Sequence, residues 1–246
     1  IAGMEAALDL KETGNTPILF EKSENLGGQF LLAGAISAKK DFKNAVDKMI
    51  LDVQESGIEV HLNTVCTKER IEEIRPDALI VAIGSSPFVL PIEGSERAIV
   101  AHDVLSEKVQ VPGDNVVIIG GGLVGFETAE FLAARQKKVT VLEMKEKALQ
   151  DLGPLRQITA QFAMAQMPIT IETSTTVERI EDHVVVASGK KYPYDSVIMA
   201  VGSKANDTSM YANLGIPTYI VGDCKKAGVA LDAFKDAYHA VLEINK

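Results

Sequence analysis

Apolar residues along this chain fall into short runs and helical stripes that alternate with each other. Residues 3–11 and 42–55 carry apolar side chains at helical spacing, whereas residues 17–21 and 58–63 read as short strands. Residues 77–84 form an apolar run that ends at glycine, which is typical of a buried parallel strand. This alternation of strands and helices predicts an α/β fold with parallel sheets.

The second part of the chain shows the same alternation of elements. The elements expected there are a strand at 115–119, a helix at 123–135, a strand at 138–143, a helix at 154–164, a strand at 169–172, a small β-meander at 177–190, a strand at 195–202, a strand at 219–224 and then an alanine-rich helix.

Two segments of the sequence match each other closely. Residues 2–7 (AGMEAA) match residues 124–129 (VGFETA), and each segment runs without a gap to a strand that ends in glutamate, Glu21 or Glu143. The spacing from Gly3 to Glu21 equals the spacing from Gly125 to Glu143. Residues 195–202 also repeat the pattern of residues 77–84, an aspartate, an apolar run and Ala-x-Gly. The repeat therefore covers whole domains, and it predicts two related folding units.

A glycine motif typical of dinucleotide-binding turns begins just before the second copy and overlaps it. In Gly120-x-Gly122-x-x-Gly125 the first glycine permits a tight strand-to-helix turn, the second admits a pyrophosphate to the backbone, and the third lets helix and strand pack closely. The helix start offers unpaired N–H groups and a partial positive charge to phosphates. Glu143 follows about 20 residues later, where an acidic residue binds the adenosine ribose. The motif predicts a dinucleotide site.

Glu143 also bears on which nicotinamide cofactor is used. Its carboxylate would repel a ribose 2′-phosphate, which favours NADH over NADPH. Lys145 lies close in sequence and would soften this preference, so NADPH stays open as the less favoured alternative.

In the first copy the corresponding features are sparser. Gly3 is the only glycine of the motif present, but Glu21 stands at the ribose position; the alternative for Glu21 is a solvent-facing strand end. Gly27-Gly28 leaves backbone exposed for a diphosphate or an isoalloxazine, or forms an ordinary turn. Asp223 follows a buried strand and either binds a ribityl hydroxyl, caps the following helix, or does both.

Composition narrows the classes of function. The chain has 246 residues, 46% of them hydrophobic, and a net charge of −9, which argues against a nucleic-acid surface. It has no apolar run near the roughly 20 residues that cross a bilayer, so we expect a soluble, cytoplasmic protein. Its two cysteines, Cys66 and Cys224, form no CxxC motif, and its four histidines show no ligand spacing. We therefore predict no metal site, no redox dithiol and no membrane contact.

These motifs together resemble the pyridine nucleotide–disulfide reductase superfamily of flavoproteins with two dinucleotide-binding domains. More narrowly, they resemble the carboxy-terminal half of the 2,4-dienoyl-CoA reductase, enoate reductase and trimethylamine dehydrogenase group. The resemblance rests on residues 2–7, Glu21-Lys22, 26–29, 76–87, 120–129, 195–202 and 221–224.

The resemblance implies an NAD(H)-binding domain, residues 101–202, inserted into an FAD-binding domain, residues 1–100 and 203–246. It implies that FAD is held by Gly3, Glu21, Lys22, Gly27, Gly28, Gln29, backbone near Val65, Ala82, Gly84, Gly222 and Asp223. It implies that NADH lies on Gly120, Gly121, Gly122, Val124, Gly125, Glu143 and Gly202.

This chain differs from the family pattern in one respect. The chain begins one strand too late for a full FAD domain, so we expect the central first strand of that sheet to be missing and its neighbours' ladder groups to be unpaired. We infer a longer polypeptide whose upstream part, in the narrower group, is a flavin-bearing barrel with an iron–sulfur cluster. FMN and the cluster would belong to that part.

The implied activity is hydride transfer from NADH to FAD, with electrons passing to an acceptor elsewhere. The cofactors supply this chemistry, so no side chain is expected to act as a general acid or base. Two alternatives remain, a scaffold that holds ADP or FAD without turnover and a free-standing NADH-dependent reductase of a small electron carrier.

Overall fold

The computed structural model describes residues 1–34, 40–150 and 152–246, and the chain divides into two compact units. Unit 1 consists of Ile1–Ser86 and Lys204–Lys246, and unit 2 of Pro87–Ser203. Unit 2 is therefore inserted within unit 1. The chain passes between them through β4 (Ser85–Pro87) and β13 (Ser203–Ala205), which pair with each other.

The structure places residues 87–100 in unit 2, whereas the sequence assigned them to the first domain. Two backbone contacts explain the difference. The short strand β5 (Ile99–Val100) pairs in parallel with β12 (Ser196–Met199), and Ile180 N donates a hydrogen bond to Glu93 O at 2.8 Å. Both partners belong to unit 2, so this segment is held there.

Unit 1 is an α/β unit with short strands. Its remaining helices and strands are α1 (Ala2–Glu12), β1 (Ile18–Phe20), α2 (Phe30–Ala33), α3 (Lys40–Glu55), β2 (Glu59–His61), α4 (Lys68–Ile74), β3 (Leu79–Val81), β14 (Thr218–Ile220) and α8 (Ala230–Ile244), with 3₁₀ turns at Ser209–Tyr211 and Gly222–Cys224.

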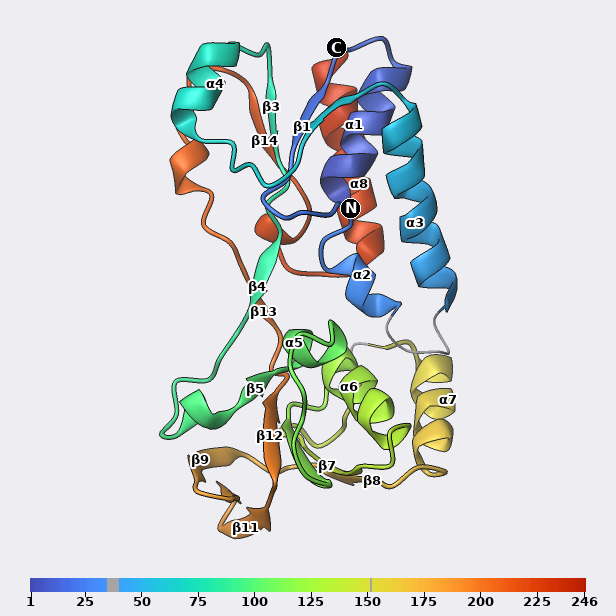
Figure 1. The fold of residues 1–246 in the computed structure, drawn as a ribbon, viewed down its shortest axis with the longest axis vertical. Coiled ribbons are helices and arrows are strands. Elements are labelled where there is room, and N and C mark those ends of the chain that lie inside the picture. The colour runs from blue at the N-terminus through green and yellow to red at the C-terminus, as the bar shows by residue number, and fades with distance from the viewer. Residues whose placement is uncertain (35–39, 151) are drawn as a thin grey trace. The chain divides into compact units, whose positions relative to one another are not determined.

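The strands of unit 1 form two separate parallel pairs, β1 with β2 and β3 with β14. Helix α1 contacts both pairs and packs between α8 and α3 (Figure 1). Alanines line the contact between α1 and α8, and their small side chains let the two helices pack closely. Ala6 and Ala237 are buried in this contact, at 2% and 0% exposed. On its other side α1 packs through Met4 against Val46 and Val53 of α3.

Unit 2 contains a five-stranded parallel sheet in the order β5-β12-β6-β7-β8. Its remaining elements are α5 (Ala101–Leu105), β6 (Asn115–Ile119), α6 (Leu123–Ala133), β7 (Lys138–Leu142), α7 (Pro154–Met164), β8 (Ile169–Glu172), β9 (Val177–Glu181), β10 (Val184–Ala187) and β11 (Lys190–Pro193), with a 3₁₀ turn at Ser95–Arg97. The strand order reverses beside β6, because β7 and β8 lie to one side of it and β12 to the other. Such a reversal is where α/β sheets bind ligands.

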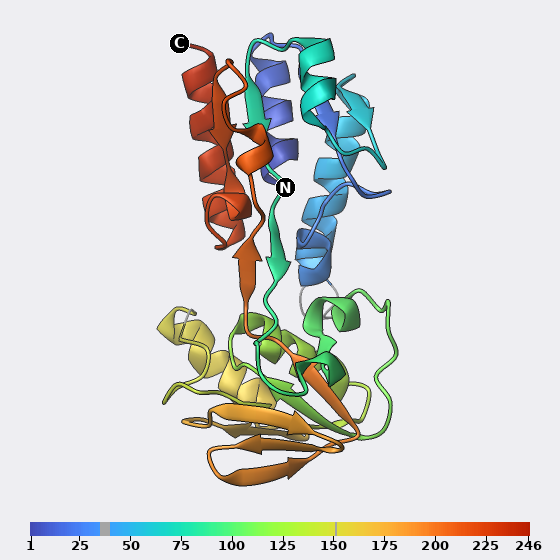
Figure 2. The ribbon, with the colours of Figure 1, turned by 90° about the vertical axis from the view of Figure 1, so that its left-hand side faces the viewer.

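Each face of this sheet is covered by different elements (Figure 2). The antiparallel meander β9–β11 packs on one face, where Val185 meets Val117 and Val197 in one buried cluster. Helices α6 and α7 lie on the other face. Residues 116–119 of β6 are all buried, because successive residues of a strand point to opposite faces and both faces of this sheet are covered.

The helices and strands agree with the sequence-based α/β prediction, which is confirmed. The short helices α2, α4 and α5 were not predicted. Among the described residues, no helix is long and apolar enough to cross a membrane.

Candidate functional site

The glycine motif of unit 2 forms the turn between β6 and α6. Gly120 has a φ of +109°, and a Cβ there would overlap the carbonyl oxygen of Ala200. A Cβ at Gly125 would overlap the carbonyl oxygen of Gly120. The turn and the close contact between helix and strand therefore require glycine at both positions, as the motif predicted.

Helix α6 begins directly after this turn. Gly122 is its N-cap, and the first bond of the helix runs from Phe126 N to Gly122 O at 3.1 Å. The N–H groups of residues 123–125, which include Val124 and Gly125, precede that bond and have no carbonyl partner within the helix. Together with the helix dipole they form a site suited to a phosphate.

Glu143 lies beside this turn, directly after β7, and is 7% exposed. Its Oε2 accepts a hydrogen bond from Gly121 N at 2.7 Å, and its Oε1 accepts one from Lys145 N at 2.8 Å. These bonds fix the orientation of the carboxylate. Each oxygen keeps a further lone pair, so a ribose diol can still bind.

Backbone bonds hold the segment around Glu143 as well. Glu143 N donates to Glu172 O, and Thr175 N donates to Glu143 O, both at 2.9 Å. The strand end at Glu143 is thus tied on both sides to the segment that follows β8.

Unit 1 repeats this arrangement around Glu21, which directly follows β1. Glu21 Oε1 accepts from Ser23 N at 2.8 Å, the counterpart of the bond from Lys145. Glu21 N donates to His61 O and Thr64 N donates to Glu21 O, both at 2.9 Å. The repeat seen in the sequence is therefore also a repeat of hydrogen bonds, and Glu21 is a fixed carboxylate at a strand end.

The surviving glycine of the first copy occupies the same structural position as its counterpart. A Cβ at Gly3 would lie 3.3 Å from the Cβ of Ala82, and one at Gly125 would lie 3.5 Å from the Cβ of Ala200. Ala82 directly follows β3 and Ala200 directly follows β12. These two strands lie within the matching apolar runs, residues 77–84 and 195–202.

Three further predicted glycines leave open backbone. Gly28, Gly84 and Gly202 have φ values of +54°, +69° and +96°, and a Cβ at each would meet nothing within 4 Å. Gly27 differs, because a Cβ there would lie 2.9 Å from Leu31 Cγ. A side chain at Gly27 would therefore collide with the packing of the loop, whereas the space beside the other three glycines is open.

Three polar residues of unit 1 form a connected group. Gln29 Nε2 donates to the backbone oxygen of Ser85 at 2.6 Å and to its Oγ at 3.0 Å, and Ser85 Oγ donates to Asp223 Oδ2 at 2.9 Å. The suggestion that Asp223 caps the following helix is wrong. The N-cap of α8 is Val229, and Asp223 Oδ1 accepts instead from Gly228 N at 3.2 Å.

The remaining predicted residues of unit 1 also lie beyond strand ends. Val65 follows β2 and is 56% exposed, and Lys22 is exposed beside Glu21. Gly222, at φ +66°, follows β14 and lies against Ala2, where an added Cβ would be 3.1 Å from the Cβ of Ala2. These residues therefore lie beyond the carboxyl ends of parallel strands, the edge at which α/β sheets bind ligands.

Ser85 was not among the residues predicted for the site, although it contacts two of them. Its signal was the repeat itself, because serine follows the glycine in both copies, as Gly84-Ser85 and Gly202-Ser203. The structure shows that Ser85 is 8% exposed and joins two predicted residues.

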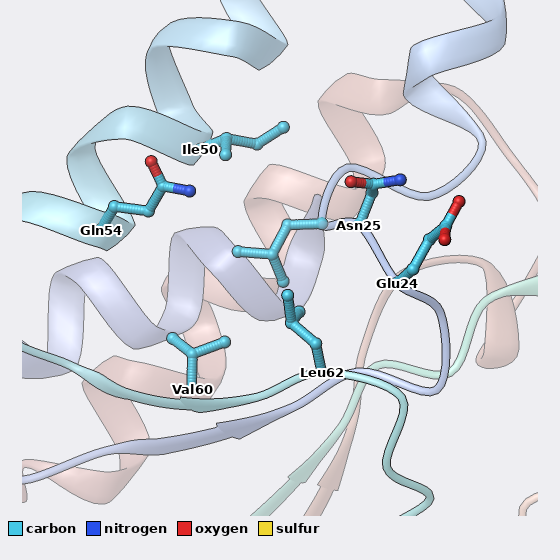
Figure 3. A pocket seen from close by; sticks show the side chains of 7 residues that line it. Glu24, Asn25, Ile50, Gln54, Val60 and Leu62 are labelled. Atoms are coloured by element: carbon cyan, nitrogen blue, oxygen red, sulfur yellow. The ribbon is translucent and has the colours of Figure 1, made fainter.

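A pocket of about 200 Å³ lies elsewhere in unit 1 (Figure 3). Its lining residues are Glu24, Asn25, Leu26, Ile50, Gln54, Val60 and Leu62. The lining is mostly apolar, contains no predicted site residue and offers no cation for a phosphate. Among the described residues, no group of three or more His, Cys, Asp or Glu side chains is arranged to hold a metal ion.

Comparison with known proteins is consistent with this geometry. The family model for pyridine nucleotide-disulphide oxidoreductase matches residues 1–227. The chain is 32% identical to an NADH oxidase of Thermoanaerobacter brockii, over 99% of this chain and 39% of that protein. It is 33% identical to a cinnamate reductase of Clostridium sporogenes, over 99% of this chain and 38% of that protein.

A solved structure of a reductase is also similar to this chain. The complex of 2-naphthoyl-CoA reductase with 2-naphthoyl-CoA superposes with a TM-score of 0.88 at 30% identity, over 96% of this chain and 37% of that one. The chain thus spans about two fifths of the length of the relatives it matches.

Proposed function

Because the chain belongs to the pyridine nucleotide-disulphide oxidoreductase family, we propose that it is a flavoprotein module that passes a hydride from NADH to FAD. The observation that carries the proposal is the duplicated set of bonds around Glu21 and Glu143, each at a strand's carboxyl end. Two such arrangements in one chain suit two dinucleotides. We assign FAD to unit 1 and NADH to unit 2.

In unit 2 the start of α6 would hold the pyrophosphate. The N–H groups after Gly122 and the open backbone at Gly202 suit the diphosphate and the nicotinamide half of the cofactor. Glu143 would accept hydrogen bonds from the adenosine ribose. Its buried carboxylate would face a 2′-phosphate at close range, so we propose NADH over NADPH.

In unit 1 the ligand residues would divide along FAD. Glu21 and Lys22, with backbone near Val65, would hold the adenosine, and the backbone at Gly27 and Gly28 would hold the diphosphate. The flavin half would lie against Gln29, Ala82 and Gly84, with Gly222 and Asp223 on the ribityl chain. Gly3, at the start of α1, would let the helix approach the diphosphate closely.

When bound, FAD and NADH would supply the hydride chemistry, with the flavin as acceptor and the nicotinamide as donor. The chain's own contribution is to bind and align the two cofactors. No side chain is assigned as a general acid or base.

The lengths of the relatives support a second part of the proposal. We propose that this module works within a longer enoate reductase-like polypeptide in the cytoplasm, where electrons leave the FAD for an upstream flavin barrel. A reducible substrate of the enoate class would then accept them.

The purified protein provides a direct test of the hydride step. With FAD bound, anaerobic NADH should bleach the visible flavin absorbance, and NADPH should do so less effectively. A colourless protein that releases only ADP on denaturation would instead establish a nucleotide scaffold and overturn the proposal. Catalytic reduction of a small electron carrier by this chain alone, with NADH in excess, would favour the free-standing reductase.

A further inference from the structure

Ser85 connects two loops of unit 1 that are far apart in sequence. Its Oγ accepts a hydrogen bond from Gln29 Nε2 at 3.0 Å and donates one to Asp223 Oδ2 at 2.9 Å. Its backbone oxygen accepts a second bond from Gln29 Nε2 at 2.6 Å. The other carboxylate oxygen of Asp223 accepts from Gly228 N at 3.2 Å. Both oxygens of Asp223 and the amide of Gln29 are therefore held in one orientation.

The chemistry of a serine hydroxyl fixes the direction of these bonds. A hydroxyl has one hydrogen and two lone pairs, and the carboxylate of Asp223 can only accept. The hydrogen of Ser85 therefore points to Asp223, and a lone pair receives the Gln29 amide. Successive bonds of this kind polarise one another in a site of low dielectric, and Ser85 is only 8% exposed.

Asp223 keeps the capacity to bind a ligand within this arrangement. Each carboxylate oxygen accepts one bond within the chain and retains another acceptor position. Those positions suit hydroxyl donors, such as the ribityl hydroxyls of a flavin. Their directions are set by the bonds that Asp223 already makes.

We propose that Ser85 is a positioning residue of the flavin site, which holds Asp223 and Gln29 in the orientation that binds FAD. The inference rests on the proposed function, in which unit 1 is the FAD site. Ser85 acts through these two side chains, so its contribution depends on the carboxylate of Asp223.

The test compares FAD dissociation constants, measured by quenching of flavin fluorescence, for wild type and variants stripped of flavin. Ser85→Ala should weaken FAD binding about tenfold, because one hydrogen bond to a charged group is lost. Ser85→Thr keeps a hydroxyl at this position and should retain most of the wild-type affinity for FAD. Ser203→Ala is the matched control, because Ser203 follows Gly202 as Ser85 follows Gly84, and it should leave the FAD constant unchanged.

A double-mutant cycle separates positioning from general stability. In an Asp223→Asn background, Ser85→Ala should have little further effect on FAD affinity, because the charged acceptor has already gone. Full additivity of the two substitutions, or equal FAD affinity of Ser85→Ala and wild type, would overturn the role of Ser85 and leave the proposed function standing. A wild-type protein that binds ADP but no FAD would overturn both.

Discussion

Gly125 shows at the residue scale how one missing side chain sets a local structure. An added Cβ would overlap the carbonyl oxygen of Gly120, which is backbone and cannot rotate away. Gly3 holds the equivalent position in unit 1 with more room, since its nearest neighbour is the Cβ of Ala82 at 3.3 Å. The same motif position is thus under stricter steric control in unit 2.

This difference predicts the effect of a single methyl group. Gly125→Ala should lower the free energy of unfolding by about 1–3 kcal/mol, because the close contact between α6 and β6 must open. Urea unfolding followed by circular dichroism measures it. Gly153→Ala is the control, because a Cβ there meets nothing within 4 Å. Equal losses in the two variants would contradict the steric explanation.

At the scale of elements, Asp195 ties the start of one strand to another. It directly precedes β12, and its Oδ2 accepts from the backbone N–H groups of Asp114 and Asn115 at 2.9 and 2.8 Å, just where β6 begins. The hydrogen bonds from Asn115 and Asp114 lower the pKa of the Asp195 carboxyl. Hydrogen bonds to the ionised carboxylate thus connect the starts of β6 and β12, which are neighbours in the sheet.

This lowered pKa predicts a pH-dependent stability. A carboxyl with a lowered folded pKa stabilises the fold above its unfolded pKa of about 3.9, and this stabilisation is lost as pH falls through the folded value. Asp195→Asn should therefore lower the urea midpoint at neutral pH, and the difference from wild type should shrink in acid. Asp77 is the counterpart of Asp195 in the repeat and is also exposed. Asp77→Asn should leave the urea midpoint unchanged both at neutral pH and in acid. A difference that is constant with pH would refute the role of the ionised carboxylate.

The long helices and the strands of unit 2 other than β5 were predicted within a few residues, because their apolar periodicity extends over enough positions to be recognised. Helix α4 (Lys68–Ile74) buries only Ile71, and α2 (Phe30–Ala33) is a single turn, so neither has a period to detect. The strand expected over residues 77–84 is only Leu79–Val81 in the structure. A strand extends only as far as its partner, and β14 has three residues.

For the whole molecule, the proposed function places one nucleotide at each of the two matching sets of bonds, so the two sites should be weakened separately. Glu143 is fixed by Gly121 and Lys145, and Glu21 by Ser23, within units that each have their own buried clusters. A change in one carboxylate should therefore act on one cofactor.

Paired substitutions test this separation. Glu143→Gln should raise the dissociation constant of NADH about tenfold or more and leave FAD content unchanged, because a neutral amide replaces a charged acceptor. Glu21→Gln should lower FAD affinity and leave NADH binding unchanged. Isothermal titration with each cofactor measures both constants, and Glu146→Gln, at an exposed position, is the control. Loss of both cofactors in either variant would contradict independent sites.

The sequence by itself determined the family, the α/β class, the repeat and the two strand-end glutamates. Each of these is encoded by local periodicity, by glycine at fixed spacing or by an internal match, which require no knowledge of distant contacts. Only the tertiary structure decided that residues 87–100 pack in unit 2, that Asp223 does not cap α8 and that Ser85 joins Gln29 to Asp223. The first and the last depend on side chains and strands that meet across more than fifty residues of chain, which local patterns do not record. The second depends on where α8 begins, with its N-cap at Val229, six residues after Asp223.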